Sequence, residues 1–154
     1  VYHSTSNGKT ENAEVVWKVS YPYLKSVNSS WDKNVSSYER TIDKSLEELN
    51  KILGITIDEI KEIKLIRNNT GRVEEVIIGE EKYQGTDFRM LLGLRSTDFD
   101  ITLKENKIII TTRGYGHGVG MSQYGANEMA KQGKTYKQIL NHYYTNIKFS
   151  TVKN

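Results

Sequence analysis

The stretch RGYGHGVGMSQYGANEMA, residues 113–130, has a glycine at every second position from Gly114 to Gly120. In an extended strand, residues two apart share a face, so these four glycines would leave one face without side chains. Glycine within a strand usually marks a bulge, a corner or the close approach of another backbone or a ligand. The stretch therefore predicts either tight packing of a neighbouring element on the bare face or a flat surface for a large ligand, with Tyr115 and His117 beside it.

Two common glycine motifs do not fit this stretch. The nucleotide-binding pattern G-x-G-x-x-G fails because Val119 and Gln123 occupy the positions of its last glycine. The hydrolase pattern G-x-S-x-G fails around Ser122, which makes this serine a poor nucleophile. Ser122 is better placed as the N-cap of a following helix, at whose start Gln123 and Tyr124 would present polar groups.

Hairpins and short helices alternate on the N-terminal side of the glycine stretch. Residues 63–67 and 73–78 show a two-residue apolar period on either side of the turn at 68–71, which predicts a β-hairpin. A second hairpin is predicted from residues 99–103 and 107–112. A short strand is expected near residues 82–83. The predicted fold class is therefore α+β.

Helix starts are marked by serine or threonine, and several helix ends by glycine. The patterns S-x-x-E and T-x-x-Q are capping boxes. In a capping box, the side chain of the first residue accepts from the backbone N–H of the last residue, and the side chain of the last residue accepts from the backbone N–H of the first. Five helical segments are predicted in chain order. The first runs from Ser45 to Gly54, and the second is a short turn at 56–59. The third runs from Thr86 to near Gly93, the fourth from Ser122 to Gly133, and the fifth begins at Thr135.

Length and composition narrow the class of protein. The chain has 154 residues, about one domain, with 36% hydrophobic residues and no apolar run near the ~20 residues of a membrane span. It has no cysteine, which excludes disulfides and thiolate chemistry. The net charge is +3, and acidic residues are interleaved with the basic ones, so the charge pattern does not predict nucleic-acid binding. A slightly cationic surface is still compatible with binding an anionic polymer. The chain begins at Val1 within an expected strand, so we expect the C-terminal part of a larger protein.

The spacing of histidine, carboxylate and aromatic residues does not indicate a catalytic or metal site. The three histidines lie far apart in the sequence, so a metal site is not predicted. Several carboxylates could act as a catalytic acid, but their spacing singles out none of them. No catalytic triad and no pair of carboxylates is visible, so the sequence does not favour a hydrolase. Aromatic rings that could stack on sugars are more numerous. The candidates are His3, His117 and His142; Glu11, Asp32, Glu39 and Asp98; and Trp31, Tyr115, Tyr124, Tyr143 and Tyr144.

The sequence resembles the SpoIID/LytB family over nearly its whole length. The closest resemblance is to the C-terminal part of the sporulation members of the family. The blocks that carry the resemblance occur in the expected order. They are STSNGKTENAEVVW at 4–17, PYLKSVNSSWD at 22–32, GTDFRMLLGLRSTDF at 85–99, RGYGHGVGMSQYGANEMA at 113–130 and ILNHYYTNIKF at 139–149.

This resemblance implies a lytic transglycosylase that cleaves denuded peptidoglycan strands between N-acetylmuramic acid and N-acetylglucosamine, leaving 1,6-anhydro ends. One glutamic acid would act first as acid and then as base, because the muramoyl 6-hydroxyl replaces water. The implied setting is engulfment during sporulation, outside the cytoplasm, with a membrane anchor beyond this chain. The implied partners are a cell-wall amidase and a membrane scaffold. The alternative is an amidase enhancer, a module that binds glycan without cutting it.

The resemblance also has a gap. The family's catalytic glutamate, and the His/Cys cluster that holds zinc in some members, lie in an N-terminal segment whose pattern does not occur in residues 1–154. No catalytic or metal residue and no cofactor is therefore expected from this chain itself. The resemblance carries a role in holding sugar groups and orienting the acid onto Ser4, Ser6, Thr10, Glu11, Tyr115, His117, Ser122, Gln123 and Tyr124.

Overall fold

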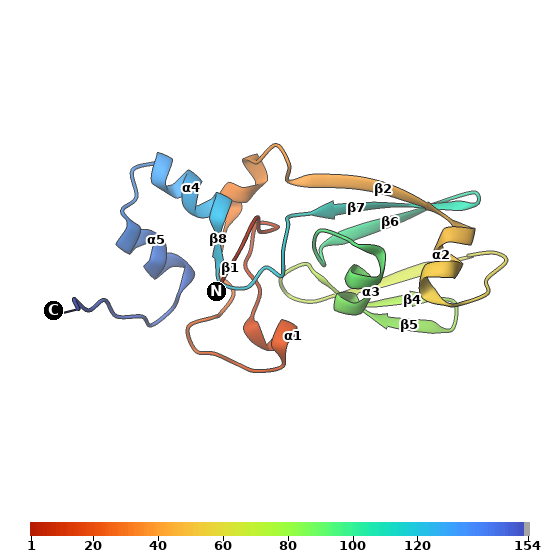
Figure 1. Cartoon of the computed structure of the whole chain (residues 1–154), viewed down its shortest axis with the longest axis horizontal. Coiled ribbons are helices and arrows are strands. Elements are labelled where there is room, and N and C mark those ends of the chain that lie inside the picture. Colours follow the sequence, from red (N-terminus) through yellow and green to blue (C-terminus); the bar gives the residue numbers. More distant parts are fainter. Residues whose placement is uncertain (153–154) are drawn as a thin grey trace. The chain divides into compact units, whose positions relative to one another are not determined.

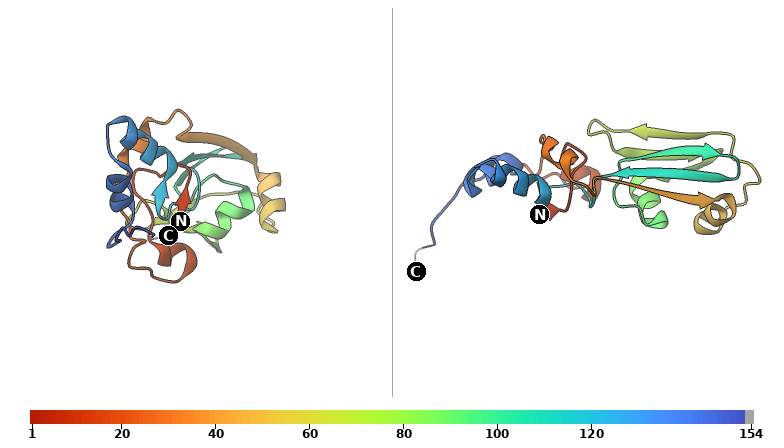
Figure 2. Two further views of the ribbon diagram at one scale, coloured as in Figure 1. Left: turned by 60° about the vertical axis from the view of Figure 1, so that its left-hand side comes forward. Right: turned by 90° about the horizontal axis from the view of Figure 1, so that it is seen from above.

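A computed structural model describes residues 1–152 and divides the chain into two compact units (Figures 1 and 2). Unit 1 comprises Val1–Val35 and His117–Asn154, and unit 2 comprises Ser36–Gly116. Unit 2 is therefore inserted in the chain between the two segments of unit 1. Helices and antiparallel strands together confirm the predicted α+β class.

Unit 2 contains two three-stranded antiparallel sheets. Their strand orders are β2-β7-β6 and β3-β4-β5. The strands are β2 (Glu39–Ser45), β3 (Ile63–Arg67), β4 (Val73–Ile78), β5 (Glu81–Gln84), β6 (Phe99–Lys104) and β7 (Lys107–Arg113). Both predicted hairpins and the short strand near 82–83 are confirmed. Strand β2 was not predicted, because its sequence ERTIDKS has only one apolar residue and therefore shows no apolar alternation.

Two helices complete unit 2, α2 (Leu46–Leu53) and α3 (Gly85–Leu92). The capping box at Ser45 is confirmed, since its hydroxyl accepts from Glu48 N at 3.1 Å and Glu48 Oε2 accepts from Ser45 N at 2.8 Å. Both helices contribute to one apolar core with residues of both sheets. The buried members of this core are Leu49, Val73, Val76, Ile78, Phe88, Leu92, Leu94, Phe99, Ile108 and Ile110.

Two predicted helix starts in unit 2 are wrong. Helix α3 begins at Gly85, with Gln84 and not Thr86 as its N-cap. A Cβ at Gly85 would lie 1.8 Å from Val73 O, so a side chain does not fit at this first residue of the helix beside strand β4. Residues 56–59 form no helix. Asn50 holds this segment instead, because its side-chain amide accepts from the backbone N of Ile57 at 3.2 Å and donates to its carbonyl at 2.8 Å.

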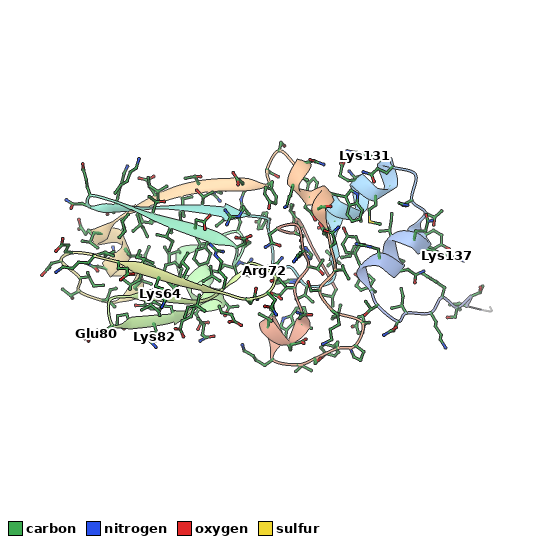
Figure 3. The ribbon with its side chains drawn as sticks, turned by 180° about the vertical axis from the view of Figure 1, so that it is seen from behind. Lys64, Arg72, Glu80, Lys82, Lys131 and Lys137 are labelled. Atoms are coloured by element: carbon green, nitrogen blue, oxygen red, sulfur yellow. The ribbon has the colours of Figure 1, made fainter. Side chains whose placement is uncertain are left out.

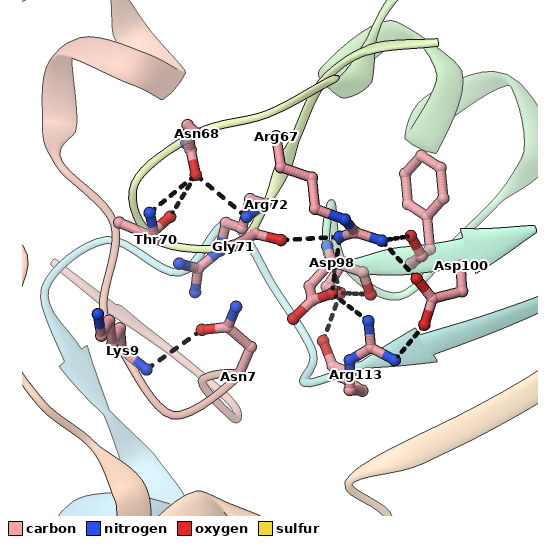
Figure 4. Close-up of polar contacts among 12 residues, drawn as sticks. Asn7, Lys9, Arg67, Asn68, Thr70, Gly71, Arg72, Asp98, Asp100 and Arg113 are labelled. Carbon is pink, nitrogen blue, oxygen red and sulfur yellow. Dashed lines mark hydrogen bonds and ion pairs between the residues drawn. The ribbon is translucent and has the colours of Figure 1, made fainter. Parts of the chain in front are cut away.

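An arginine–aspartate network joins strands of the two sheets in unit 2 (Figure 4). Arg67 contacts Asp98 at 3.3 Å and Asp100 at 2.5 Å, and Arg113 contacts each of these aspartates at 2.7 Å. Arg67 also donates to the carbonyl of Gly71 at 2.8 Å. The hydrogen bond from Arg113 and the charges of both arginines lower the pKa of Asp100. The network therefore links the β3–β4 turn to the start of strand β6.

Unit 1 is built from short elements. They are β1 (Tyr2–His3), α1 (Ala13–Trp17), the 3-10 helix η1 (Ser30–Asn34), β8 (Met121–Ser122), α4 (Gln123–Lys131) and α5 (Tyr136–Tyr143). Strands β1 and β8 pair in parallel. The N-cap at Ser122 and the capping box at Thr135 are confirmed. Helices α1 and η1 were not predicted, because five residues are too few to show a helical period.

The glycine stretch does not form the extended strand that its alternation suggested. Gly114, Gly116, Gly118 and Gly120 all have positive φ angles, between 75° and 111°. Residues with a side chain rarely adopt a positive φ angle. The four glycines therefore allow the backbone to change direction repeatedly and do not form a flat face. The predicted close approach is confirmed at Gly120, where a Cβ would lie 2.3 Å from Val1 O.

The helices of the described residues are all too short or too polar to cross a bilayer.

Candidate functional site

The first sequence block of the resemblance, residues 4–17, and the part of the glycine-rich block from His117 onward meet in unit 1. Strand β1 pairs with strand β8, with His3 opposite Ser122, and Glu11 forms a parallel bridge with Val119. The backbone N of Glu11 donates to Gly118 O at 2.8 Å. The carbonyl of Ser4 accepts two hydrogen bonds from the start of helix α4. One donor is the hydroxyl of Ser122 and the other is the backbone N of Tyr124. Eight of the nine predicted site residues therefore belong to unit 1.

Asp32 of the 3-10 helix lies at the centre of a buried group of hydrogen bonds. Its carboxylate accepts from the hydroxyls of Ser122 and Ser29, each at 2.5 Å, and from the backbone N–H groups of Ser6 and Gly125. Ser29 also contacts the hydroxyl of Tyr143 at 2.7 Å. The Asp32 side chain is fully enclosed, so one carboxylate joins the N-terminal loop, η1, the start of α4 and helix α5. We call these residues the Asp32 hub.

Burial changes the electrostatics of this hub. Removal from water raises the pKa of Asp32, although its four hydrogen bonds oppose the shift by stabilising the ionised form. Burial also raises the pKa of Tyr143, which stays a neutral donor or acceptor. Gly125 allows the groups to approach, because a Cβ there would lie 2.1 Å from the Tyr143 hydroxyl and 2.7 Å from Ser29 Oγ.

Four predicted site residues are buried and bind protein groups. Ser6 donates to Lys9 O at 2.6 Å, and the hydroxyl of Thr10 accepts from Val27 N at 2.9 Å. Glu11 is 1% exposed and accepts from Asn12 N at 2.8 Å. Ser122, described above, is the fourth. These side chains hold the loops in place, so the surface of the site comes from their neighbours.

His117 lies among aromatic rings in unit 1. Its ring centroid is 5.2 Å from that of Trp17 and 5.9 Å from that of His3. The Nδ1 atom of His117 accepts from Val119 N at 3.0 Å, while the Nδ1–H of His3 donates to Val119 O at 3.1 Å. In its neutral form His117 therefore carries its proton on Nε2, where it is a hydrogen-bond donor. Trp17 is 41% exposed and offers a flat face beside it.

The remaining predicted residues are more accessible. Gln123 and Tyr124 are exposed at the start of helix α4, and Ser4 is half-buried. Tyr115 belongs to unit 2, where it is 51% exposed and lies 5.3 Å from the guanidinium of Arg95. Unit 1 thus has an imidazole, an amide, a phenol and an indole that are not fully buried.

Sequence reasoning missed the hub as a unit. The sequence patterns indicate Asp32 only as one of several carboxylates and indicate no role for Ser29 or Trp17. The spacing Ser29-x-x-Asp32 was a usable local signal, because a serine three residues before an aspartate can bond to it within one turn. Nothing in the sequence indicates that Ser122, ninety residues later, shares the same carboxylate.

No metal cluster lies at the predicted residues in the part of the chain that the structure describes. Within residues 1–152, no three His, Cys, Asp or Glu side chains are grouped so that they could hold a metal ion. A cavity of about 510 Å³ lies in unit 2, lined in part by Ile57, Ile60, Lys64 and Ile77. It contains none of the nine predicted site residues.

Comparison with known proteins identifies relatives of the chain. It is 46% identical over 152 residues to stage II sporulation protein D of Bacillus amyloliquefaciens and 44% identical over 151 residues to that of Bacillus subtilis. Each match covers 97% of this chain and 44% of the relative. A shorter match, 34% identical over 82 residues, links 51% of the chain to 12% of the Bacillus subtilis amidase enhancer.

No protein-family model matches the sequence. The chain spans less than half the length of the curated relatives it matches, and the matched region is their C-terminal part. Since each match covers 97% of this chain, it extends through both units. The chain therefore belongs to the family of stage II sporulation protein D.

Proposed function

We propose that this chain is the C-terminal part of a sporulation lytic transglycosylase that cleaves denuded peptidoglycan strands and leaves 1,6-anhydro ends. The observation that carries the proposal is the identity of 44–46% to stage II sporulation protein D over 97% of the chain. The cleavage reaction itself comes from the family resemblance of the sequence blocks. The protein would act outside the cytoplasm during engulfment, beside a cell-wall amidase and a membrane scaffold.

In this proposal, unit 1 forms one wall of the substrate site. The rings of His117, Trp17 and Tyr124 would offer flat faces to sugar rings. Gln123 would bind a polar group of the sugar. The Asp32 hub would keep these residues in place, because it fixes the start of helix α4 against the N-terminal loop.

The catalytic acid would come from outside residues 1–154. Glu11 and Asp32 are both buried, and each accepts hydrogen bonds from protein groups. A general acid must reach the oxygen of the leaving group, which an enclosed carboxylate does not do. None of the residues described here is assigned to zinc, since none of their His, Asp and Glu side chains form a suitable set.

The second candidate is a module that binds glycan and activates an amidase. The match to the amidase enhancer favours it, although that match covers only 51% of the chain. The two candidates differ in the products that they predict. The enzyme forms anhydro ends by itself, whereas the enhancer changes only the rate at which an added amidase removes stem peptides.

The test uses the protein in its natural full length, incubated with denuded glycan strands and, separately, with intact peptidoglycan plus a cell-wall amidase. Mass spectrometry then counts anhydro-muropeptides and released peptides. His117→Ala should lower the rate of anhydro-end formation about tenfold or more if this ring binds the substrate. His142→Ala is the matched control, since His142 packs against Trp31 and binds Asn28 O in another part of unit 1.

Anhydro ends that depend on His117 but not on His142 would support the enzyme. Faster amidase action without anhydro ends would favour the enhancer. If neither product changes and the protein does not bind strands, the proposed function is wrong.

A further inference from the structure

We propose that unit 1 carries a second glycan contact on helix α5, separate from the site at His117, that recognises the free carboxylate of muramic acid in strands without stem peptides. The inference rests on the proposed function, because it takes denuded glycan as the ligand. It concerns a surface of lysines and aromatic rings formed by Lys134, Tyr136, Lys137, Lys148 and Phe149, which we call the α5 surface.

The charge of the chain is unevenly distributed between the two units. Unit 1 contains nine lysines against four acidic residues, whereas unit 2 contains thirteen basic and fifteen acidic residues. Two of the four acidic side chains in unit 1, Glu11 and Asp32, are buried. The other two are paired with lysines, Glu14 with Lys25 and Glu128 with Lys131. The exposed surface of unit 1 is therefore cationic.

The excess positive charge is concentrated near helix α5. Glu128 is the only acidic residue after Glu105 in the sequence. Lys134, Lys137 and Lys148 are exposed and form no ion pair with any residue in the described part of the chain. Figure 3 shows Lys137 on the outer side of helix α5, and Lys131 at the end of α4. Among residues 1–152 this surface has no acidic partner, so it would attract an anionic ligand.

Aromatic rings lie among these lysines. Tyr136 is 66% exposed and Phe149 is 41% exposed, and their rings meet edge to face with centroids 6.3 Å apart. The ammonium of Lys137 lies 5.8 Å from the centre of the Phe149 ring. The opposite side of the helix is buried, with Ile139 and Tyr143 in an apolar cluster. These two rings therefore belong to the outer surface and not to the core.

The combination fits an acidic sugar polymer. Aromatic rings offer flat faces to sugar rings, and ammonium groups pair with carboxylates. Removal of the stem peptide from muramic acid breaks the amide to its lactyl group and leaves a carboxylate there. A denuded strand thus carries repeated negative charges along a chain of sugar rings, whereas a peptide-bearing strand has an amide at the same position. The α5 surface would distinguish the two by charge.

The test measures binding of the natural full-length protein to three probes. They are denuded strands, the same strands with the lactyl carboxylates converted to methylamides, and neutral chitin oligosaccharides. The test variant is Lys134→Gln/Lys137→Gln. The matched control is Lys64→Gln/Lys82→Gln, which removes two exposed lysines from the β3–β5 sheet of unit 2, near Glu80 (Figure 3).

The α5 variant should bind denuded strands about fivefold more weakly than the wild type, as expected for the loss of two exposed charge pairs. The control variant should bind as the wild type does. Conversion of the carboxylates to methylamides should weaken binding of the wild type by a similar factor and change binding of the α5 variant little. Added salt should reduce the difference between the two proteins. Lys134→Arg/Lys137→Arg should restore binding, which a change in folding alone would not predict.

Equal binding of denuded and methylamide strands by the wild type would overturn the proposal. So would unchanged binding by the α5 variant, or equal competition by a polyphosphate without sugars. Cleavage of denuded strands is measured with the same protein samples, so that failure of the α5 surface can be distinguished from failure of the proposed function. If anhydro ends form while the α5 variant binds normally, only the α5 surface is wrong. If binding depends on the carboxylate but no anhydro ends form, the α5 surface stands and the transglycosylase is wrong.

Discussion

The two units of this protein are stabilised by different interactions. Unit 2 has one apolar core that joins two sheets and two helices, with side chains such as Phe88 and Ile110 fully buried. Unit 1 has two small apolar clusters, and a fully buried carboxylate at Asp32 links four of its segments. Apolar packing is nondirectional, whereas hydrogen bonds require defined angles and distances. Unit 1 therefore depends on directional contacts at the place where the candidate site is formed.

The difference has a consequence for function. A buried carboxylate with all its donors present fixes the relative positions of the loops that contribute them. Ser122 belongs to this hub, and the next two residues, Gln123 and Tyr124, are exposed site candidates. A change at the hub should therefore affect ligand binding as well as stability. A comparable change in the core of unit 2 should affect stability alone.

Removal of the hub carboxylate should have the largest effect. We expect Asp32→Ala to lower the free energy of unfolding by about 4 kcal/mol, because the hydroxyls of Ser29 and Ser122 and the backbone N–H of Ser6 would lose a buried acceptor. Urea denaturation gives the total loss, and hydrogen exchange should locate it in unit 1. Ser29→Ala should cost only about 1–2 kcal/mol. Equal losses in the two variants would show that the carboxylate is not the centre of the hub.

A backbone contact in unit 2 should have the next largest effect. Gly85→Ala should cost about 3 kcal/mol, because the new Cβ would lie 1.8 Å from the carbonyl oxygen of Val73 and the backbone has to move. Gly93→Ala is the control, since a Cβ there meets nothing within 4 Å and only the positive φ of 63° opposes it. That variant should lose about 1 kcal/mol. Thermal unfolding of both variants tests the difference, and a larger loss at Gly93 would contradict it.

The ionic network of unit 2 should contribute less than the hub. Asp98→Asn should cost about 2 kcal/mol, because the Asp98 side chain is only 8% exposed and accepts from Arg67 and Arg113. Asp43→Asn should change stability by less than about 0.5 kcal/mol, as its side chain is 67% exposed and lies 3.8 Å from Lys107. Denaturant midpoints for the two variants provide the measurement. Similar losses would mean that burial does not strengthen the network.

The smallest expected effect is a difference in pH dependence between the units. Burial raises the pKa of Asp32 on folding, so the folded state binds its proton more tightly than the unfolded state. The stability of unit 1 should therefore fall as pH rises from near 3.8, the ordinary value, through the higher folded value. The hydrogen bond from Arg113 lowers the pKa of Asp100, so unit 2 should lose stability as pH falls below that ordinary value.

Hydrogen exchange followed by mass spectrometry at several pH values, corrected for intrinsic exchange rates, would compare the two units. Asp32→Asn should remove the slope in unit 1 and leave that of unit 2 unchanged. The same slope in both units, or an unchanged slope in the variant, would contradict the assignment.

Local sequence patterns predicted the elements whose interactions lie close together in the chain. The capping boxes at Ser45 and Thr135 and the N-cap at Ser122 depend on residues three positions apart. Both hairpins of unit 2 follow from apolar alternation around polar turns. The blocks of the resemblance placed His117 and Ser4 in one predicted site, and the structure brings their segments together in unit 1.

Other features depend on contacts between distant residues. Thr86 has the side chain of an N-cap, but helix α3 begins at Gly85, which lies against Val73, so its N-cap Gln84 is two residues earlier. Residues 56–59 have a capping pattern, but Asn50 binds their backbone in a nonhelical form. In each case a contact with a residue outside the capping pattern, seven positions away at Asn50 and twelve at Val73, outweighed a local preference of about 1 kcal/mol.

The sequence by itself determined the fold class, the hairpins, the capped helices and the family of this protein, because these follow from short-range patterns and from sequence identity. Only the tertiary structure decided that Asp32 and Ser122, ninety residues apart, share one buried hydrogen bond. It likewise decided that the alternating glycines turn the backbone with positive φ instead of forming a flat strand. The physical reason is that a buried charge and a reversed backbone are stable only when distant segments supply their partners and exclude water, and no local pattern records that arrangement.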